Sequence, residues 1–138
     1  MNKHPLRQFK ESPGATLAGL KALLADDVVF SSPIFSREVK GKDVVAQVML
    51  TSTSVRDGQF THEFKQGQDT VLIWEGKIDG HKLVSFELIV DDEEGRVAYR
   101  SVAFKPFPVT RLFRDATYEQ LKDIIPEDMW HLQPLSEE

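Results

Sequence analysis

Two ionisable side chains lie inside apolar segments of the sequence, where a charged group is unusual. Glu87 stands between an aromatic and an aliphatic residue, and His62 alternates with Phe60 and Phe64 on what reads as one face of a strand. Apolar surroundings raise the pKa of a carboxyl group, and histidine titrates close to neutral pH. Both side chains are therefore candidates for general acid or general base catalysis.

The segment from 71 to 105 must position Glu87, because it contains three apolar runs with the acid in the second. Asp79-Gly80 separates the first two runs, and an acidic turn ending in Gly95 separates the second from the third. Asp-Gly between β-rich runs is typical of a tight hairpin, since both residues tolerate positive φ. We therefore predict a meander of three long antiparallel strands.

The turns of this meander set the register of its strands. The two-residue turn pairs Trp74 with Ser85, and a four-residue turn after the second strand places Arg100 opposite Glu87. We expect Trp74, Ser85, Arg100 and Phe104 to bind a ligand beside Glu87. The face that carries Glu87 then consists of Leu72, Trp74, Leu83, Ser85, Glu87, Ile89, Arg100, Val102 and Phe104.

Glu87 has two interpretations that the sequence leaves open. A pocket lined by Trp74 and Phe104 would raise the pKa of Glu87 and let it donate a proton. A cross-strand ion pair with Arg100 would instead lower this pKa and make the carboxylate structural. We slightly favour the ion pair, because the register brings the two side chains together. For His62 we favour a side chain satisfied by a backbone group over a general base.

Periodicity and turn residues predict the elements around the meander. We expect helices at 4–12, from Pro13 (with Ser12 as N-cap) to about Ala25, from 42 to about 50, and from Thr117 to Ile125, with strands at 28–32, 34–39 and 59–66. Helices that flank four long strands are typical of an α+β fold with helices on one face of a curved antiparallel sheet. We predict one domain, residues 1–138, in which 114–138 form a C-terminal helical tail that packs on the rest.

The second face of the meander is apolar as well. It carries Val71, Ile73, Val84, Phe86, Leu88, Val90, Val97, Tyr99 and Ala103. A sheet with one solvated face alternates between apolar and polar residues, which this one does not. The predicted helices are too few to cover both faces, so we expect a homodimer through the outer face.

The overall composition excludes several classes of function. Net charge is −5 and the basic residues are scattered, which argues against a nucleic-acid surface or a polybasic membrane patch. Cysteine is absent, so disulfides and cysteine-ligated metals are excluded, and the four histidines lack metal-ligand spacing. Without a signal peptide or a transmembrane run, we expect a cytoplasmic protein with no metal and no cofactor.

Two stretches resemble a known superfamily. Leu24-Ala-Asp-Asp-Val-Val-Phe-Ser-Ser-Pro33, followed by Lys40-Gly41-Lys42-Asp43, resembles the nuclear-transport-factor-2-like (NTF2-like) proteins. The strand-turn-strand sequence at 86–97 is similar to the SnoaL-like, polyketide-cyclase-like branch, and Lys105-Pro106 stands where such proteins often have Arg-Pro. The resemblance spans roughly residues 15 to 113. It implies a cone-shaped, cystatin-like α+β barrel in which a bent antiparallel sheet wraps helices around a hydrophobic pocket, often dimeric through the outer sheet face.

The superfamily includes ketosteroid isomerase, and the resemblance implies which residues of this sequence occupy the catalytic positions of those isomerases. Glu87 falls where those isomerases place a protonated carboxyl group, and Ser32 falls where they place the aspartate base. Serine cannot abstract a carbon-bound proton unaided, and neither Gln8 nor Phe9 is the tyrosine of those enzymes. Steroid isomerase activity is therefore not expected. A SnoaL-type cyclase is similar in using an acid in its pocket, and Glu87 is compatible with that chemistry.

Three functions remain open from the sequence. One is an enzyme that acts on a hydrophobic carbonyl compound through Glu87, aided by His62 or Ser32. Another is a non-catalytic pocket for a small apolar molecule. The third is a dimerisation or protein-association module. A pocket acid with a polar partner favours the first, Glu87 locked to Arg100 favours the second, and a pocket filled by side chains favours the third.

Overall fold

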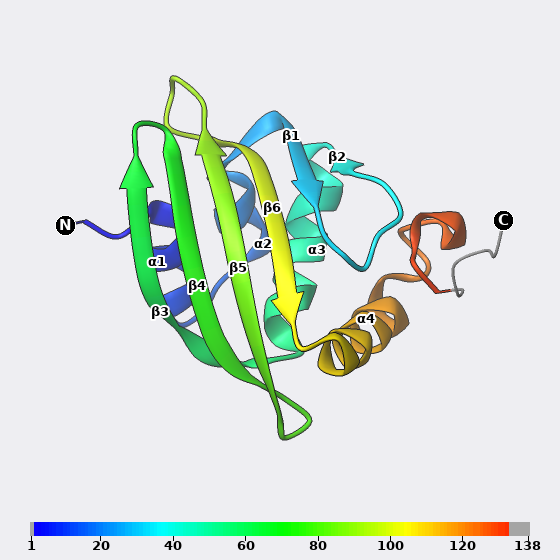
Figure 1. The fold of residues 1–138 in the computed structure, drawn as a ribbon. Helices are drawn as coiled ribbons and strands as arrows, with labels where there is room; N and C mark the ends of the chain where they lie inside the picture. Colours follow the sequence, from blue (N-terminus) through cyan, green and yellow to red (C-terminus); the bar gives the residue numbers. More distant parts are fainter. Residues whose placement is uncertain (1, 133–138) are drawn as a thin grey trace, which may run out of the picture.

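The computed structural model describes residues 2–132. In chain order the elements are α1 (Pro5–Glu11), α2 (Leu17–Lys21), β1 (Leu24–Ser31), β2 (Val39–Lys40), α3 (Lys42–Ser54), β3 (Asp57–Gln66), β4 (Asp69–Ile78), β5 (His81–Asp91), β6 (Val97–Lys105), α4 (Phe107–Leu121) and the 3₁₀ turn η1 (Glu127–Met129). The strands form one bent sheet in the order β2-β1-β6-β5-β4-β3. Helices α1, α2 and α3 lie behind this sheet, and α4 lies beside its lower end (Figure 1). The α+β class is confirmed.

The meander is present as predicted, but the whole sheet is not antiparallel. Strands β3 to β6 pair antiparallel with one another, and Trp74 lies opposite Ser85. Strand β1 pairs parallel with β6. After β1 the chain passes through β2 and α3 to β3, at the far edge of the sheet, and the meander then leads back through β4 and β5 to β6, beside β1. The sheet is therefore mixed and open rather than a closed antiparallel barrel.

An irregularity between Val90 and Asp91 changes the predicted register of the last two strands. Glu87 lies opposite Val102, and Arg100 lies two positions further along, opposite Ile89. Side chains alternate with a period of two, so this shift keeps Glu87 and Arg100 on the same face. Beyond the irregularity, the inward-facing and outward-facing positions of β6 are exchanged. Val97, which we expected on the outer face, is therefore buried.

A second irregularity lies in β3. The predicted alternation of Phe60, His62 and Phe64 on one face is wrong, because the register shifts between Phe60 and His62. Thr61 is the extra residue of this bulge, and such a residue turns the following side chains to the opposite face. Phe60 is buried on the inner face, whereas His62 and Phe64 are exposed on the outer face.

Several element boundaries also differ from the prediction. Helix α2 is short and is capped by Thr16, whose hydroxyl oxygen accepts a hydrogen bond from Gly19, rather than by Ser12. The predicted strand at 34–39 is reduced to β2. Helix α4 begins at Phe107 with a proline in its first turn, a favourable position for that residue. Thr117 is therefore inside α4 rather than its N-cap.

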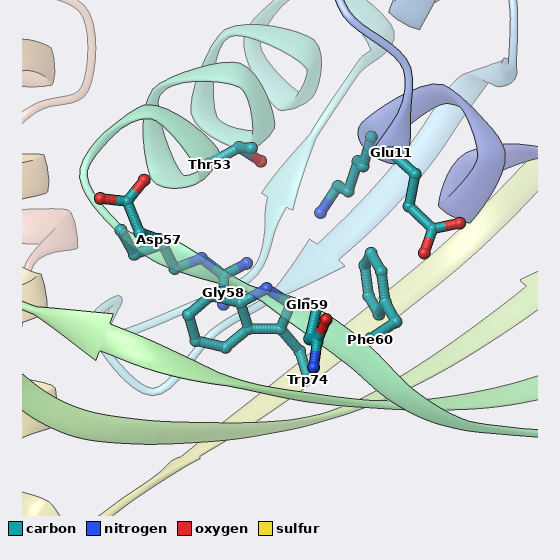
Figure 2. A pocket seen from close by; sticks show the side chains of 9 residues that line it. Glu11, Thr53, Asp57, Gly58, Gln59, Phe60 and Trp74 are labelled. Carbon is teal, nitrogen blue, oxygen red and sulfur yellow. The ribbon is translucent and has the colours of Figure 1, made fainter.

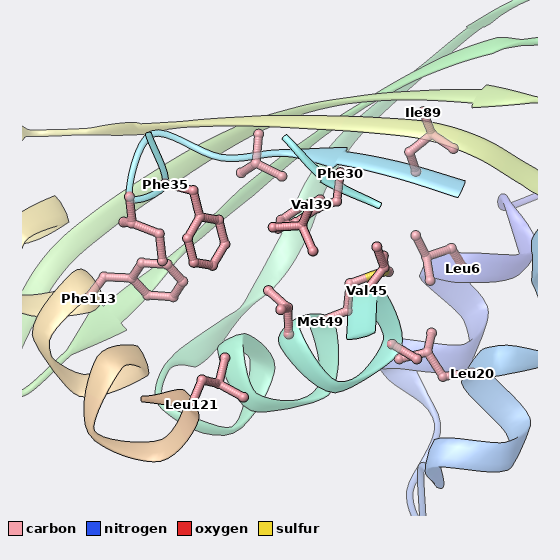
Figure 3. Packing of buried hydrophobic residues seen from close by; sticks show 14 of the residues in the cluster. Leu6, Leu20, Phe30, Phe35, Val39, Val45, Met49, Ile89, Phe113 and Leu121 are labelled. Carbon is pink, nitrogen blue, oxygen red and sulfur yellow. The ribbon is translucent and has the colours of Figure 1, made fainter. Parts of the chain in front are cut away.

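Buried aliphatic and aromatic side chains fill the space between the sheet and the helices (Figure 3). Leu20, Val45 and Met49 come from the helices and face Phe30 and Ile89 on the strands. This core fixes the inner face of β4, β5 and β6, on which Glu87 lies.

The C-terminal tail packs on the domain as far as it is described. The ring of Trp130 lies 4.8 Å from that of Phe35, and the backbone N–H of His131 donates to the carbonyl of Ile34. The expected packing is thus confirmed up to residue 132. The remainder of the predicted tail, 133–138, lies outside the described residues.

The outer face of the sheet carries exposed apolar side chains. Phe64 is 58% exposed, Phe86 40%, Leu88 37% and Val71 36%. Helices α1 to α3 cover only the opposite face (Figure 1). Within residues 2–132, no helix has the length and hydropathy needed to span a membrane.

Candidate functional site

The inner face of the meander holds a buried ion pair. Arg100 on β6 donates through Nη2 to Oε1 of Glu87 on β5 at 2.5 Å. The two side chains are 1% and 0% exposed, respectively. Their diagonal arrangement across neighbouring strands follows from the two-residue register shift. This geometry agrees with the favoured interpretation of Glu87, in which its carboxylate forms an ion pair with Arg100.

A second arginine shares the same carboxylate. Arg56 lies between α3 and β3, its side chain is 4% exposed, and its Nη2 lies 3.8 Å from Oε1 of Glu87. Its Nε donates to the carbonyl of Ser52 in the last turn of α3. The guanidinium lies 4.3 Å from the centre of the Trp74 ring, so a cation–π contact also helps to hold the Arg56 side chain in place.

Lys10 brings a third basic group toward this cluster from α1. Its Nζ is buried and has no hydrogen-bond partner among residues 2–132, and the same is true of Nη1 of Arg56. Burial is the main cause that lowers the pKa of Lys10 well below its usual value, and the charges of Arg100 and Arg56 lower it further. The negative charge of Glu87, by contrast, raises the pKa of Lys10.

These charges decide the protonation state of Glu87. Burial alone would raise its pKa, but the charges of Arg100, Lys10 and Arg56 and the hydrogen bond from Arg100 outweigh burial and lower the pKa to about 2. At neutral pH Glu87 is an ionised carboxylate. In this arrangement it has no proton to donate as a general acid.

A cavity of about 390 Å³ opens beside the cluster. It is lined by Lys10, Glu11, Thr53, Arg56, Asp57, Gly58, Gln59, Phe60 and Trp74. Figure 2 shows the rings of Phe60 and Trp74 side by side along one wall, with Glu11 and Asp57 at opposite edges. The cavity therefore combines an aromatic wall with charged groups, whereas we expected hydrophobic walls.

Two glycines allow Trp74 to form this wall. Gly58 on β3 lies opposite Gly76 on β4. A Cβ atom on either glycine would collide with backbone of the facing strand and with the Trp74 ring. The missing side chains thus leave the space in which the indole lies across the two strands.

A much smaller cavity, about 10 Å³, lies deeper in the fold and brings together other predicted site residues. Ser32, Arg100 and Phe104 line it, together with Arg56 and five apolar neighbours. This volume holds about one water molecule at most. Ser85 is fully buried between Trp74 on β4 and Phe104 on β6, and its Oγ has no partner in the described part of the chain.

The structure thus gathers most of the predicted site but not all of it. Glu87, Arg100, Trp74, Ser85 and Phe104 share the inner face, and Ser32 lies next to Arg100. His62 is separated from them, because the β3 bulge turns it to the outer face. There its Nδ1 lies 2.9 Å from the hydroxyl of Thr61 rather than against a backbone group.

Two site residues, Lys10 and Arg56, were not predicted. Lys10 follows Leu6 by four residues on α1, so helical periodicity places it on the same buried face. That signal was available in the sequence. Arg56 lies between a helix and a strand, where no periodicity applies, and the neighbouring Asp57-Gly58 suggests only a turn. The described residues contain no cluster of three or more acidic or histidine side chains suited to a metal ion.

Comparison with solved structures finds the same fold in several proteins. An uncharacterised protein with a cystatin-like fold from Silicibacter pomeroyi is 25% identical, with a TM-score of 0.79 and 88% of each chain covered. A steroid delta-isomerase from Pseudomonas aeruginosa is 24% identical, with a TM-score of 0.73, over 78% of this chain and 80% of that one. A putative polyketide cyclase from Sinorhizobium meliloti is 12% identical, with a TM-score of 0.52, over 62% and 80%. No family model and no curated protein matches the sequence.

Proposed function

We propose that this chain, which shares its fold with cystatin-like and NTF2-like proteins, binds a small organic molecule in the cavity between α1, the end of α3, β3 and β4. The observation that carries this proposal is a cavity of about 390 Å³ with the rings of Trp74 and Phe60 on one wall. Pockets for small ligands are typically about 300–1,000 Å³ and are lined by aromatic groups with a few polar ones. The size and lining therefore fit this class of ligand.

Binding without catalysis is favoured over acid/base chemistry on a carbonyl compound. A cyclase- or isomerase-like reaction would use Glu87 as its acid, but the pKa of about 2 keeps this group ionised. Ser32 lines the 10 Å³ cavity and not the larger one, and His62 lies on the other side of the sheet. The isomerase and the putative cyclase share the fold at low identity, which supports no particular reaction in this chain.

Two matched variants test where the molecule binds. Thr53→Phe places a ring in the cavity from the last turn of α3, whereas Ser54→Phe places the same ring on the exposed neighbouring position. A library of small aromatic and alicyclic molecules is screened against the wild-type protein by saturation-transfer NMR. Each hit is then measured by calorimetry with both variants.

We expect hits with the wild-type protein whose affinity falls at least about tenfold in Thr53→Phe and is unchanged in Ser54→Phe. The ring fills space that a ligand would occupy, and it adds no charge. A library without hits, or equal binding by wild type and Thr53→Phe, contradicts the proposal. Far-UV circular dichroism of both variants confirms that they remain folded.

We also propose that a second copy of the chain covers the outer sheet face. Phe64, Phe86 and Leu88 are exposed there, on β3 and β5, and none of the helices within residues 2–132 packs on them. A hollow of about 520 Å³ on this face carries both Glu75 and the amino groups of Lys82 and Lys105. A two-fold axis would place these opposite charges against each other, since such an interface pairs one patch with itself.

Light scattering coupled to size exclusion tests this interface. We expect a dimer at micromolar concentration that Phe86→Asp dissociates, because the variant buries a charge in an apolar contact. Ile124→Asp is the matched control, since Ile124 is 45% exposed, follows α4 and does not line this hollow. A monomeric wild-type protein contradicts the proposal.

A further inference from the structure

The buried charges beside the cavity do not balance. Lys10, Arg56 and Arg100 surround a single carboxylate, Glu87, so protonated Lys10 leaves two positive charges in excess and neutral Lys10 leaves one. Burying a charge without a counter-ion is costly, and proteins normally pair such groups. The cluster is therefore one in which an added negative charge would be stabilised.

The unused hydrogen-bond donors belong to two residues that line the cavity. Nζ of Lys10 and Nη1 of Arg56 have no partner within residues 2–132, and both side chains line the 390 Å³ cavity. They come from α1 and from the junction of α3 with β3, so they approach the cavity from different elements. Nε and Nη1 of Arg100 also have no partner within residues 2–132, but Arg100 lines the deeper, 10 Å³ cavity and not the larger one.

The acidic residues at the rim do not supply the missing charge. Glu11 is held by Lys3 at 3.0 Å and by Arg7 at 3.3 Å. Asp57 is exposed to solvent at the opposite edge (Figure 2). The second oxygen of Glu87, Oε2, has no hydrogen-bond partner in the part of the chain that the structure describes, but this one acceptor cannot satisfy all of the unpaired nitrogen atoms of Lys10, Arg56 and Arg100.

On the basis of the proposed function, we propose that the ligand is an aromatic or alicyclic carboxylate whose anionic group binds between Lys10 Nζ and Arg56 Nη1 while its ring packs on Trp74 and Phe60. Ammonium and guanidinium groups form charge-assisted hydrogen bonds with carboxylate oxygens that are about twice as strong as neutral ones. The guanidinium of Arg56 is already held against Trp74 and Ser52, so little order is lost when the anion binds.

Binding of the anion should take up a proton. The charged groups that act on Lys10 are Arg100 on β6, Glu87 on β5 and Arg56 between α3 and β3. Glu11 and Asp57 are the other charged residues that line the cavity. Burial and the two arginines favour the neutral amine, and a bound carboxylate favours the ammonium form. We therefore expect affinity to fall as pH rises, with net proton uptake measured by calorimetry in buffers of different ionisation enthalpy.

The test compares acids with neutral molecules of the same shape. Benzoate, cinnamate and 2-naphthoate are titrated into the wild-type protein beside benzamide, cinnamamide and 2-naphthamide. At least one acid should bind about 10- to 100-fold more tightly than its amide, the difference expected for a hydrogen bond to a charged group. Lys10→Met should remove that preference, and Lys65→Met, an exposed lysine on β3, should leave it unchanged.

The outcomes separate this inference from the proposed function. Amides that bind as tightly as the acids overturn the anion site but leave the binding pocket in place. The same holds if neutral library molecules bind and every acid fails. If acids bind better than amides and Lys10→Met retains the full preference, the assignment to Lys10 is overturned. The wild-type comparison decides the charge preference even if a variant is poorly folded.

Discussion

Replacement of Glu87 by glutamine tests the buried charge cluster most directly. Gln keeps the shape of the side chain but removes the carboxylate that faces Arg100, Arg56 and Lys10. The pKa of Glu87 falls from 4.5 to about 2, or about 2.5 units. At 1.36 kcal/mol per unit this corresponds to about 3 kcal/mol of folding stability at neutral pH. Breaking buried ion pairs typically costs a similar amount, about 3–5 kcal/mol.

The pH dependence has a definite sign. Because the pKa of Glu87 is lower in the folded state, its contribution is fully present above about pH 4.5 and is lost as pH falls toward about 2. Urea unfolding of wild type and Glu87→Gln, followed by circular dichroism at a fixed protein concentration, gives the difference at each pH. We expect about 3 kcal/mol near neutral pH and a steady decrease through this acidic range.

The control is Glu119→Gln, which removes an exposed carboxylate on α4 that pairs with Lys122. Surface pairs of this kind contribute about 0–1 kcal/mol, so we expect little change at any pH. A cost below about 1 kcal/mol for Glu87→Gln at neutral pH would refute the buried ion pair as described. A difference that does not change between pH 4.5 and 2 would refute the lowered pKa.

Three further predictions concern stability and the cavity wall. Lys10→Met should raise the free energy of unfolding by about 1 kcal/mol or leave it unchanged in urea titrations, because it removes a buried amino group that has no hydrogen-bond partner within residues 2–132. Gly76→Ala should lower it by about 1–3 kcal/mol and shift the indole N–H signal of Trp74 in NMR spectra, since a methyl group collides with the ring. Trp130→Ala should lower the free energy of unfolding by about 3–5 kcal/mol by removing the contact with Phe35 and opening a gap under the tail.

The meander could be predicted from the sequence because its signals are local. Asp79-Gly80 alone sets the register of β4 and β5, and the structure has Ile78 opposite His81 as expected. The register of β5 and β6 was missed by two residues. One arises at the turn, where Asp91 pairs with Val97 rather than Arg96, and one at the irregularity after Val90, which has no signature in residue types. The error did not move Glu87 or Arg100 to another face, because side chains alternate with a period of two.

Other errors changed the candidate site. The β3 bulge at Thr61 moved His62 out of it, and alternation of residue types cannot reveal an inserted residue. Lys10 was overlooked because a lysine on a short helix is ordinarily solvent-exposed. Arg56 has one local contact, with Ser52, but its place beside Glu87 and Trp74 depends on tertiary structure, since these two residues lie on other strands. The sequence therefore indicates the apolar faces and the pairing of Glu87 with Arg100, whereas Lys10 and Arg56, which complete the charge cluster, were identified only in the structure.

The three basic residues also change the meaning of the acid that the superfamily resemblance singles out. In apolar surroundings alone, Glu87 would keep its proton, which is the state required of an acid catalyst. Arg100 and Arg56 remove that option by holding the carboxylate ionised. The same carboxylate in turn keeps two arginines in place beneath the cavity, and Lys10 adds a third positive charge at its wall. One acid among three bases is an arrangement that favours binding of anions over donation of protons.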